Sequence, residues 1–185
     1  DSLQRFPDDR EVLARGISLG LRCLASLADE EGRRAEALSI AARWRAFCHD
    51  QVPDGDGVTP MHREAADADM TTISMLRQAG DNDAAIALLD EAAPFIERLY
   101  AAEPALYDNA ILQARALRHR GQLLVDAGDP AGALPCFADQ IAVLESWKNS
   151  EPQAGLVKAL LDEAQGFMAQ LADRTASTPA VAAPE

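Results

Sequence analysis

The chain has 185 residues and a formal net charge of −13, because 30 acidic residues stand against 17 lysines and arginines. It has no run of about 18 apolar residues that could cross a bilayer, and its three cysteines are too few for a disulfide framework. The negative charge disfavours nucleic-acid binding, and an apolar content of 48% excludes disorder throughout the chain.

Composition predicts that the fold is entirely α-helical. Alanine accounts for 37 residues, whereas aromatic residues make up 5% of the chain. Alanine is the best helix former and is depleted from strands. We therefore expect an all-α protein, and the length is that of one domain.

Apolar periodicity and turn residues predict seven helices. The expected ranges are about 8–29, 33–50, 60–79, 82–102, 105–127, 130–148 and 151–174. Two of these helices are expected to begin at capping signals, Thr59 with Pro60 and Ser150 with Gln153 three residues later. Pro94 falls within the fourth helix and is expected to kink or break it.

A pattern repeats every 48 residues around three glycines, Gly32, Gly80 and Gly128. Each glycine follows one amphipathic segment and precedes another, which predicts a tight turn between two helices with the glycine in the left-handed conformation. Asp81 and Asp129 directly follow two of the glycines and are expected to cap the next helix. An alanine stands five residues after each glycine, where a small side chain lets paired helices approach closely; these are Ala37, Ala85 and Ala133.

This pattern resembles the tetratricopeptide repeat (TPR) family, which has a turn glycine, an alanine five residues later and an apolar or aromatic residue nine residues later. The third repeat matches best, at Leu117, Gly121, Leu124, Gly128, Ala133 and Phe137. The second repeat departs from the family pattern at Thr72 and Ile73. The 48-residue period also exceeds the family's usual length of about 34, so the match is to a long-helix variant of the kind found in large bacterial multidomain proteins.

The resemblance implies a right-handed α-solenoid of TPR-like helical hairpins. The hairpins would cover about 8–50, 60–102 and 105–148, and a polar-faced capping helix would close the array at 151–174. A helical repeat domain would thus span 1–174, followed by a flexible tail at 175–185.

In this family the first helix of each hairpin lines a concave groove, and the resemblance places nine residues there. They are Arg22, Ser26, Met70, Ser74, Arg77, Arg115, Arg118, His119 and Gln122. Helical spacings place them on common stripes independently of the resemblance, and no carboxylate lies in this central band. Two interpretations stay open. The arginines bind an acidic side chain or C-terminal carboxylate of a peptide, or they pair with neighbouring acids and only solvate the surface.

No set of residues predicts catalysis, a metal site or a cofactor. Cys48, His49 and Asp50 have the residue types of a catalytic chain, but neighbours on a helix point about 100° apart and cannot bond to one another in series. The segment 54–57 has the first acids of a calcium loop and lacks the later ligands. We therefore expect a protein that is not an enzyme and that needs no metal or cofactor.

The sequence and the resemblance together predict a protein–protein interaction module or scaffold. We expect the C-terminal part of a larger bacterial regulatory protein, located in the cytoplasm, where unpaired cysteines stay reduced. Its partner would be a protein or peptide, and not a nucleic acid or a membrane. One alternative is self-association into a homodimer, and a weaker one is an accessory domain that regulates an attached kinase or caspase-like protease.

Overall fold

The structure, a computed structural model, describes residues 7–53, 58–149 and 154–177. These residues form seven α-helices and no strand, as the sequence predicts. The helices are α1 (Pro7–Glu30), α2 (Arg34–Asp50), α3 (Pro60–Gln78), α4 (Asn82–Ala102), α5 (Tyr107–Asp126), α6 (Pro130–Glu145) and α7 (Ala154–Ser177). Most ends lie within two residues of the predicted ones, and Pro94 does not interrupt α4.

The predicted end of the sixth helix, at 148, is wrong by three residues. α6 ends at Glu145, and the Trp147 N–H donates to the Leu144 carbonyl at 2.9 Å in the turn that follows. The predicted start of the seventh helix involves Ser150 and Gln153, which lie outside the described residues.

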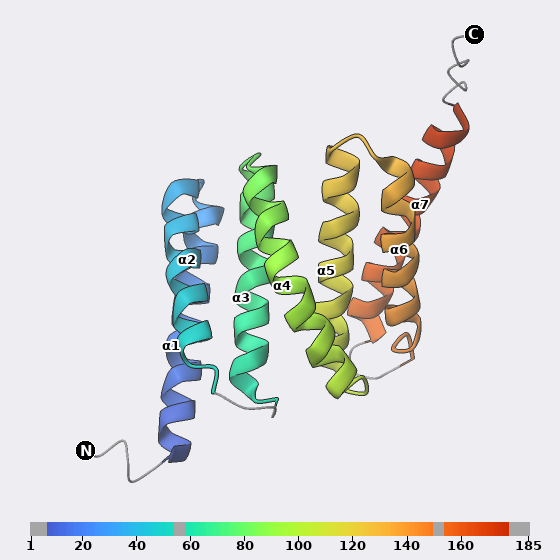
Figure 1. Ribbon diagram of the computed structural model, residues 1–185. Coiled ribbons are helices and arrows are strands. Elements are labelled where there is room, and N and C mark those ends of the chain that lie inside the picture. Colours follow the sequence, from blue (N-terminus) through green and yellow to red (C-terminus); the bar gives the residue numbers. More distant parts are fainter. Residues whose placement is uncertain (1–6, 54–57, 150–153, 178–185) are drawn as a thin grey trace. The chain divides into compact units, whose positions relative to one another are not determined.

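The chain forms two compact units, 1–112 and 113–185, and the boundary falls inside α5. In the first unit, α1 packs on α2, α2 on α3 and α3 on α4, and α1 also contacts α3 (Figure 1). In the second unit, α6 packs on α7, and the last turns of α5 join their apolar core.

The three repeated glycines adopt the predicted left-handed conformation, with φ values of 75° at Gly32, 82° at Gly80 and 83° at Gly128. At each of them the glycine N–H and the next N–H donate back to carbonyls in the last turn of the helix, at 2.8–3.0 Å. This is the Schellman ending, which satisfies carbonyls that a helix end leaves unpaired. The three hairpin turns therefore have the same physical basis.

Side-chain caps begin α4 and α6, after two of these turns, and α3, after the α2–α3 connection. Asp81 Oδ1 accepts from the Ala84 N–H at 3.2 Å, and Asp129 Oδ1 accepts from the Gly132 N–H at 2.8 Å, which confirms both predicted caps. Thr59 caps α3, and its N–H donates to Nδ1 of His62 at 3.2 Å.

Small residues line the contacts within the hairpins. The alanines five residues after the turn glycines are all buried, as expected for close helix packing; they are Ala37, Ala85 and Ala133. Trp44 and Phe137 are fully buried and fill the cores of the first and second units. No helix in the described part of the chain is long and apolar enough to span a bilayer.

One close contact makes Gly121 a sensitive position. A Cβ added there would lie 2.8 Å from Cζ of Phe137, closer than real Cβ contacts. We expect Gly121→Ala to lower the free energy of unfolding by about 1–2 kcal/mol, because overpacking outweighs the gain in helix propensity. Urea denaturation followed by circular dichroism measures this.

Gly166→Ala is the matched control, since Gly166 lies inside α7 of the same unit and an added Cβ meets no described atom within 4 Å. We expect it to raise the free energy of unfolding by up to about 1 kcal/mol. Equal effects of the two substitutions would contradict the proposed packing of Gly121 on Phe137.

His62 makes stability depend on pH. Burial lowers the pKa of His62, and the neighbouring Arg63 and Arg98 lower it further. Its Nδ1 accepts the Thr59 N–H, which also requires the neutral ring. In the unfolded chain the imidazole takes up a proton near pH 6.5, whereas in the folded chain it resists protonation. Stability from this residue is therefore complete above about pH 6.5 and is lost as the pH falls below it.

We expect His62→Gln to remove this dependence, because glutamine keeps an acceptor for the Thr59 N–H and does not titrate. Melting temperatures at about pH 7.5 and about pH 5.5 bracket the titration of an unfolded histidine. The native chain should lose more stability between the two than the variant, because the carboxylates contribute equally to both. An identical loss would show that His62 is not the group that titrates.

Candidate functional site

Five of the nine residues predicted for the groove lie in the first unit. Arg22 and Ser26 belong to α1, and Met70, Ser74 and Arg77 belong to α3. Arg22 is exposed, and the two serines and Arg77 are partly buried. Met70 is fully buried in the core. Its side chain therefore offers no surface to a partner, although helical spacing placed it on the groove stripe.

The other four residues lie on α5 in the second unit. Arg115 and Arg118 are partly buried, whereas His119 and Gln122 are buried. Arg115, like Arg77 of the first unit, already has an interaction partner within the chain. The accessible polar groups of the predicted stripe are thus mostly its arginines.

Two of these arginines pair with acids on the second helix further along the chain. Arg22 Nη1 donates to Asp67 Oδ2 at 3.2 Å and joins α1 to α3, and Arg118 Nη2 donates to Glu163 Oε1 at 2.5 Å and joins α5 to α7. The acid stands 45 residues after the arginine in both pairs. The same contact therefore recurs in two repeats, and pairing with neighbouring acids describes both arginines.

A hollow of about 340 Å³ lies along α1 beside α3. Its lining residues are Val12, Arg15, Gly16, Leu19, Arg22 and Glu64. All except Glu64 belong to α1, at spacings that place them on one stripe of the helix. The hollow, which we call the α1–α3 hollow, thus combines an apolar wall with two guanidinium groups.

A chain of hydrogen bonds from the core holds the Glu64 carboxylate of this hollow. Ser18 Oγ donates to Glu64 Oε2 at 2.5 Å, and Trp44 Nε1 donates to Ser18 Oγ at 2.8 Å. Ser18 and Trp44 are fully buried, so the acid is fixed from the core side. Arg15 and Arg22 remain as the exposed charged groups of the hollow.

Sequence reasoning missed Val12, Arg15 and Leu19 as members of this surface. The signal was available, since they stand ten, seven and three residues before Arg22 and continue its helical stripe. The family pattern marks only positions near the turn glycine. The long α1 extends the same face far beyond them.

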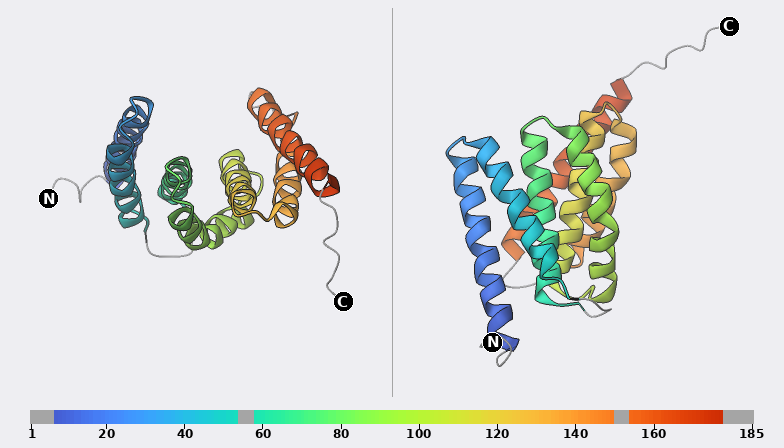
Figure 2. Two further views of the ribbon diagram at one scale, coloured as in Figure 1. Left: turned by 90° about the horizontal axis from the view of Figure 1, so that it is seen from above. Right: turned by 60° about the vertical axis from the view of Figure 1, so that its left-hand side comes forward.

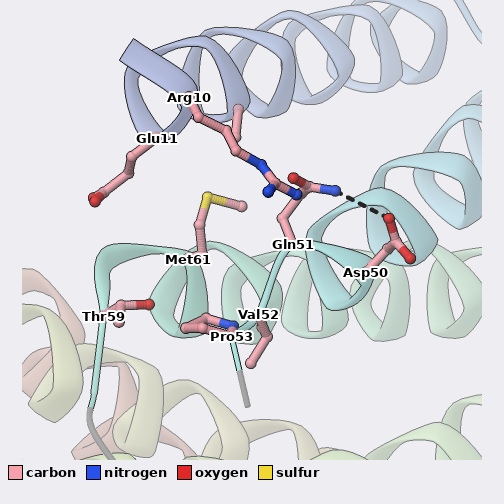
Figure 3. Close-up of a pocket in the computed structure, with 9 residues that line it drawn as sticks. Arg10, Glu11, Asp50, Gln51, Val52, Pro53, Thr59 and Met61 are labelled. Carbon is pink, nitrogen blue, oxygen red and sulfur yellow. Dashed lines mark hydrogen bonds between the residues drawn. The ribbon is translucent and has the colours of Figure 1, made fainter. Parts of the chain in front are cut away.

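A second hollow, of about 350 Å³, lies where the start of α1 meets the α2–α3 connection (Figure 3). It is lined by Arg10, Glu11, Ala14, Asp50, Gln51, Val52, Pro53, Thr59 and Met61. Gln51 Nε2 donates to Asp50 Oδ2 at 3.0 Å. The described residues contain no group of three or more His, Cys, Asp or Glu side chains that could hold a metal ion, here or elsewhere.

A cluster of ionisable groups in the first unit joins three helices. Asp69 of α3 is buried, and its Oδ1 accepts from Arg45 Nε at 2.7 Å and lies 3.0 Å from His49 Nε2. Arg45 also donates from Nη2 to Glu91 Oε1 of α4 at 2.6 Å. Because a buried carboxylate is costly unless it is paired, this network is a structural tie between α2, α3 and α4.

The Cys48, His49 and Asp50 side chains have three different partners, as their helical spacing predicts. Cys48 is buried and its Sγ lies 3.5 Å from Ser18 Oγ, His49 contacts Asp69, and Asp50 accepts from Gln51. Burial raises the pKa of the Cys48 thiol, which disfavours the reactive thiolate. The acidic segment 54–57 lies outside the described residues, so the prediction made for it is untested.

Comparison with known proteins supports the fold. No model of a known family matches the chain, and no curated protein matches it either. Among solved structures, it is similar to a TPR-like protein from Chlorobium tepidum, known from a crystal structure at 2.54 Å resolution, with a TM-score of 0.61. The match covers 88% of this chain and 97% of that chain at 21% sequence identity. The all-α, TPR-like helical repeat fold is therefore confirmed.

Proposed function

We propose that the chain is a protein-interaction module whose first helices receive a segment of a partner protein. The observation that carries this proposal is the α1–α3 hollow. Its volume of about 340 Å³ is within the range of ligand sites and is enough for one or two side chains of a peptide. The hollow is built on packed helices, so binding does not require them to form first.

The lining of the hollow suggests which segment it takes. Val12, Gly16 and Leu19 offer an apolar wall for an aliphatic or aromatic side chain, and Arg15 and Arg22 lie beside it. A guanidinium has five N–H donors, so Arg22 can bind a second carboxylate while one N–H remains on Asp67. The proposed partner segment therefore carries an apolar side chain next to an acidic side chain or a C-terminal carboxylate.

A displayed library of random peptides with free C-termini, selected against the 185-residue chain, tests this proposal. The selected peptides should be enriched in an apolar residue beside an acid or the C-terminus. Their affinity, measured by fluorescence polarisation, should fall about ten-fold or more in Arg15→Gln and Arg22→Gln, since each substitution removes a charge-assisted hydrogen bond.

Arg43→Gln is the control, because Arg43 is an exposed arginine on α2, outside the hollow. It should bind the peptides like the native chain. A library that yields no binder, or an equal loss in all three variants, would rule out this surface as the binding site. Circular dichroism of each variant separates lost binding from lost folding.

A further inference from the structure

The face of α1 that points away from α3 exposes an apolar surface. Four large apolar side chains on this face are between 48% and 54% exposed; they are Leu13, Ile17, Leu24 and Leu27. α1 lies at the outer edge of the first unit, where no helix of the described residues covers this face (Figure 2). Apolar side chains gathered on one exposed helix face are typical of an interface.

The centre of this surface follows the spacing of a coiled-coil seam. Leu13, Ile17, Gly20, Leu24 and Leu27 are separated alternately by four and three residues, which is the a/d pattern that faces a partner helix. We call these five residues, with the intervening Gly16 and Cys23, the α1 stripe. Cys23 is exposed as well.

Charge is arranged to favour contact on the stripe. The chain carries a net charge of −13, yet no acidic residue occurs between Glu11 and Asp29. The two basic residues in that interval, Arg15 and Arg22, belong to the α1–α3 hollow and not to the stripe. A second acidic molecule can therefore approach this helix face without placing carboxylates against each other.

Packing within the described part of the chain does not require the glycines of the stripe. A Cβ added at Gly16 or Gly20 would meet no atom within 4 Å among the described residues, and neither glycine has a positive φ. Glycine inside a helix costs about 0.5–1 kcal/mol relative to alanine. Small residues on a helix surface are useful where another helix comes close.

We propose that the α1 stripe binds the α1 stripe of a second copy of this chain, antiparallel, around a two-fold axis at Gly20. The stripe is symmetric in position about this residue, with members three, four and seven residues to either side. The two-fold places Leu24 of one copy over Gly16 of the other, Ile17 over Cys23, and Leu13 beside Leu27.

This arrangement is self-complementary, as a two-fold interface must be. The small Gly16 of one copy meets Leu24 of the other, and the small Cys23 meets Ile17. A parallel pair would instead set Gly16 against Gly16 and leave a gap there. Antiparallel helix dipoles also attract each other.

The exposed area fits a weak contact with a second copy. The four large side chains of the stripe are each about half exposed, which comes to roughly 350 Å², within the range of the largest patches on monomeric proteins. Their burial on two copies removes about 700 Å² in total, which is the size of a weak interface. We therefore expect a dimer that dissociates on dilution.

Sedimentation equilibrium of the full chain over a concentration series tests the dimer. The mass should rise from the monomer value of 19.8 kDa toward twice that value. Leu24→Glu should keep the chain monomeric throughout. Leu156→Glu, which alters an equally exposed leucine on α7, should dimerise like the native chain. A chain that stays monomeric at every concentration, or equal behaviour of the two variants, overturns the proposal.

Charge swapping at Gly20 tests the two-fold axis. A Cβ added at Gly20 meets no described atom within 4 Å, so we expect Gly20→Glu and Gly20→Lys to fold, and each should be monomeric because like charges would face each other. Their equimolar mixture should dimerise, since position 20 of one copy contacts position 20 of the other. A mixture that stays monomeric overturns the register.

Disulfide trapping in a Cys23→Ser background tests the direction. Leu13→Cys mixed with Leu27→Cys should give covalent dimers on mild oxidation, and either variant alone should give few. Preferential cross-linking of Leu13→Cys to itself would indicate a parallel pair and contradict the antiparallel arrangement. The outcome is separate from that of the peptide selection, since Gly20 and Leu24 do not line the α1–α3 hollow.

Discussion

The left-handed backbone at three glycines is the constraint on which the hairpins depend. At Gly32, Gly80 and Gly128 the chain reverses through a conformation that other residues rarely adopt. The Schellman hydrogen bonds at each turn then set where the second helix begins. From that point, an alanine five residues on faces the partner helix and is fully buried or nearly so. Close approach at these alanines leaves room for larger side chains such as Trp44 and Phe137 further from the turn.

Much of this fold could be predicted from the sequence because its signals are local. Turn glycines, Asp81 and Asp129 caps and the Thr59 start are each specified within a few residues, and the helices that meet at these signals begin or end where the signals indicate. Side-chain exposure on the groove stripe could not be predicted in the same way. Met70 and His119 fall on the stripe by helical spacing, yet both are buried, because exposure depends on how far neighbouring helices cover each face. That coverage is a tertiary property with no local signature.

Two of the predicted groove arginines, Arg22 and Arg118, already form ion pairs within the chain. The absence of carboxylates near Arg22 and Arg118 in sequence suggested a cationic band, but their acids come from 45 residues further along the chain. These exposed or partly buried pairs add little stability by themselves, and they join α1 to α3 and α5 to α7. Under the proposed function, specificity on this face would therefore depend on the shape and apolar wall of the α1–α3 hollow as well as on charge. In general, one fold can serve different functions because the residues that line its surface change while the fold stays the same.

The two faces of α1 have different compositions, and the difference bears on how a partner would be held. One face contributes Arg15, Leu19 and Arg22 to the α1–α3 hollow, and the neighbouring face carries the acid-free stripe, with Gly16 at the border of both. A dimer through the stripe would give each assembly two copies of the hollow, running in opposite directions. A partner with two suitable segments would then bind the second one intramolecularly, at a raised effective concentration. Modest affinity in a single small hollow is thus compatible with firm attachment of a bivalent partner.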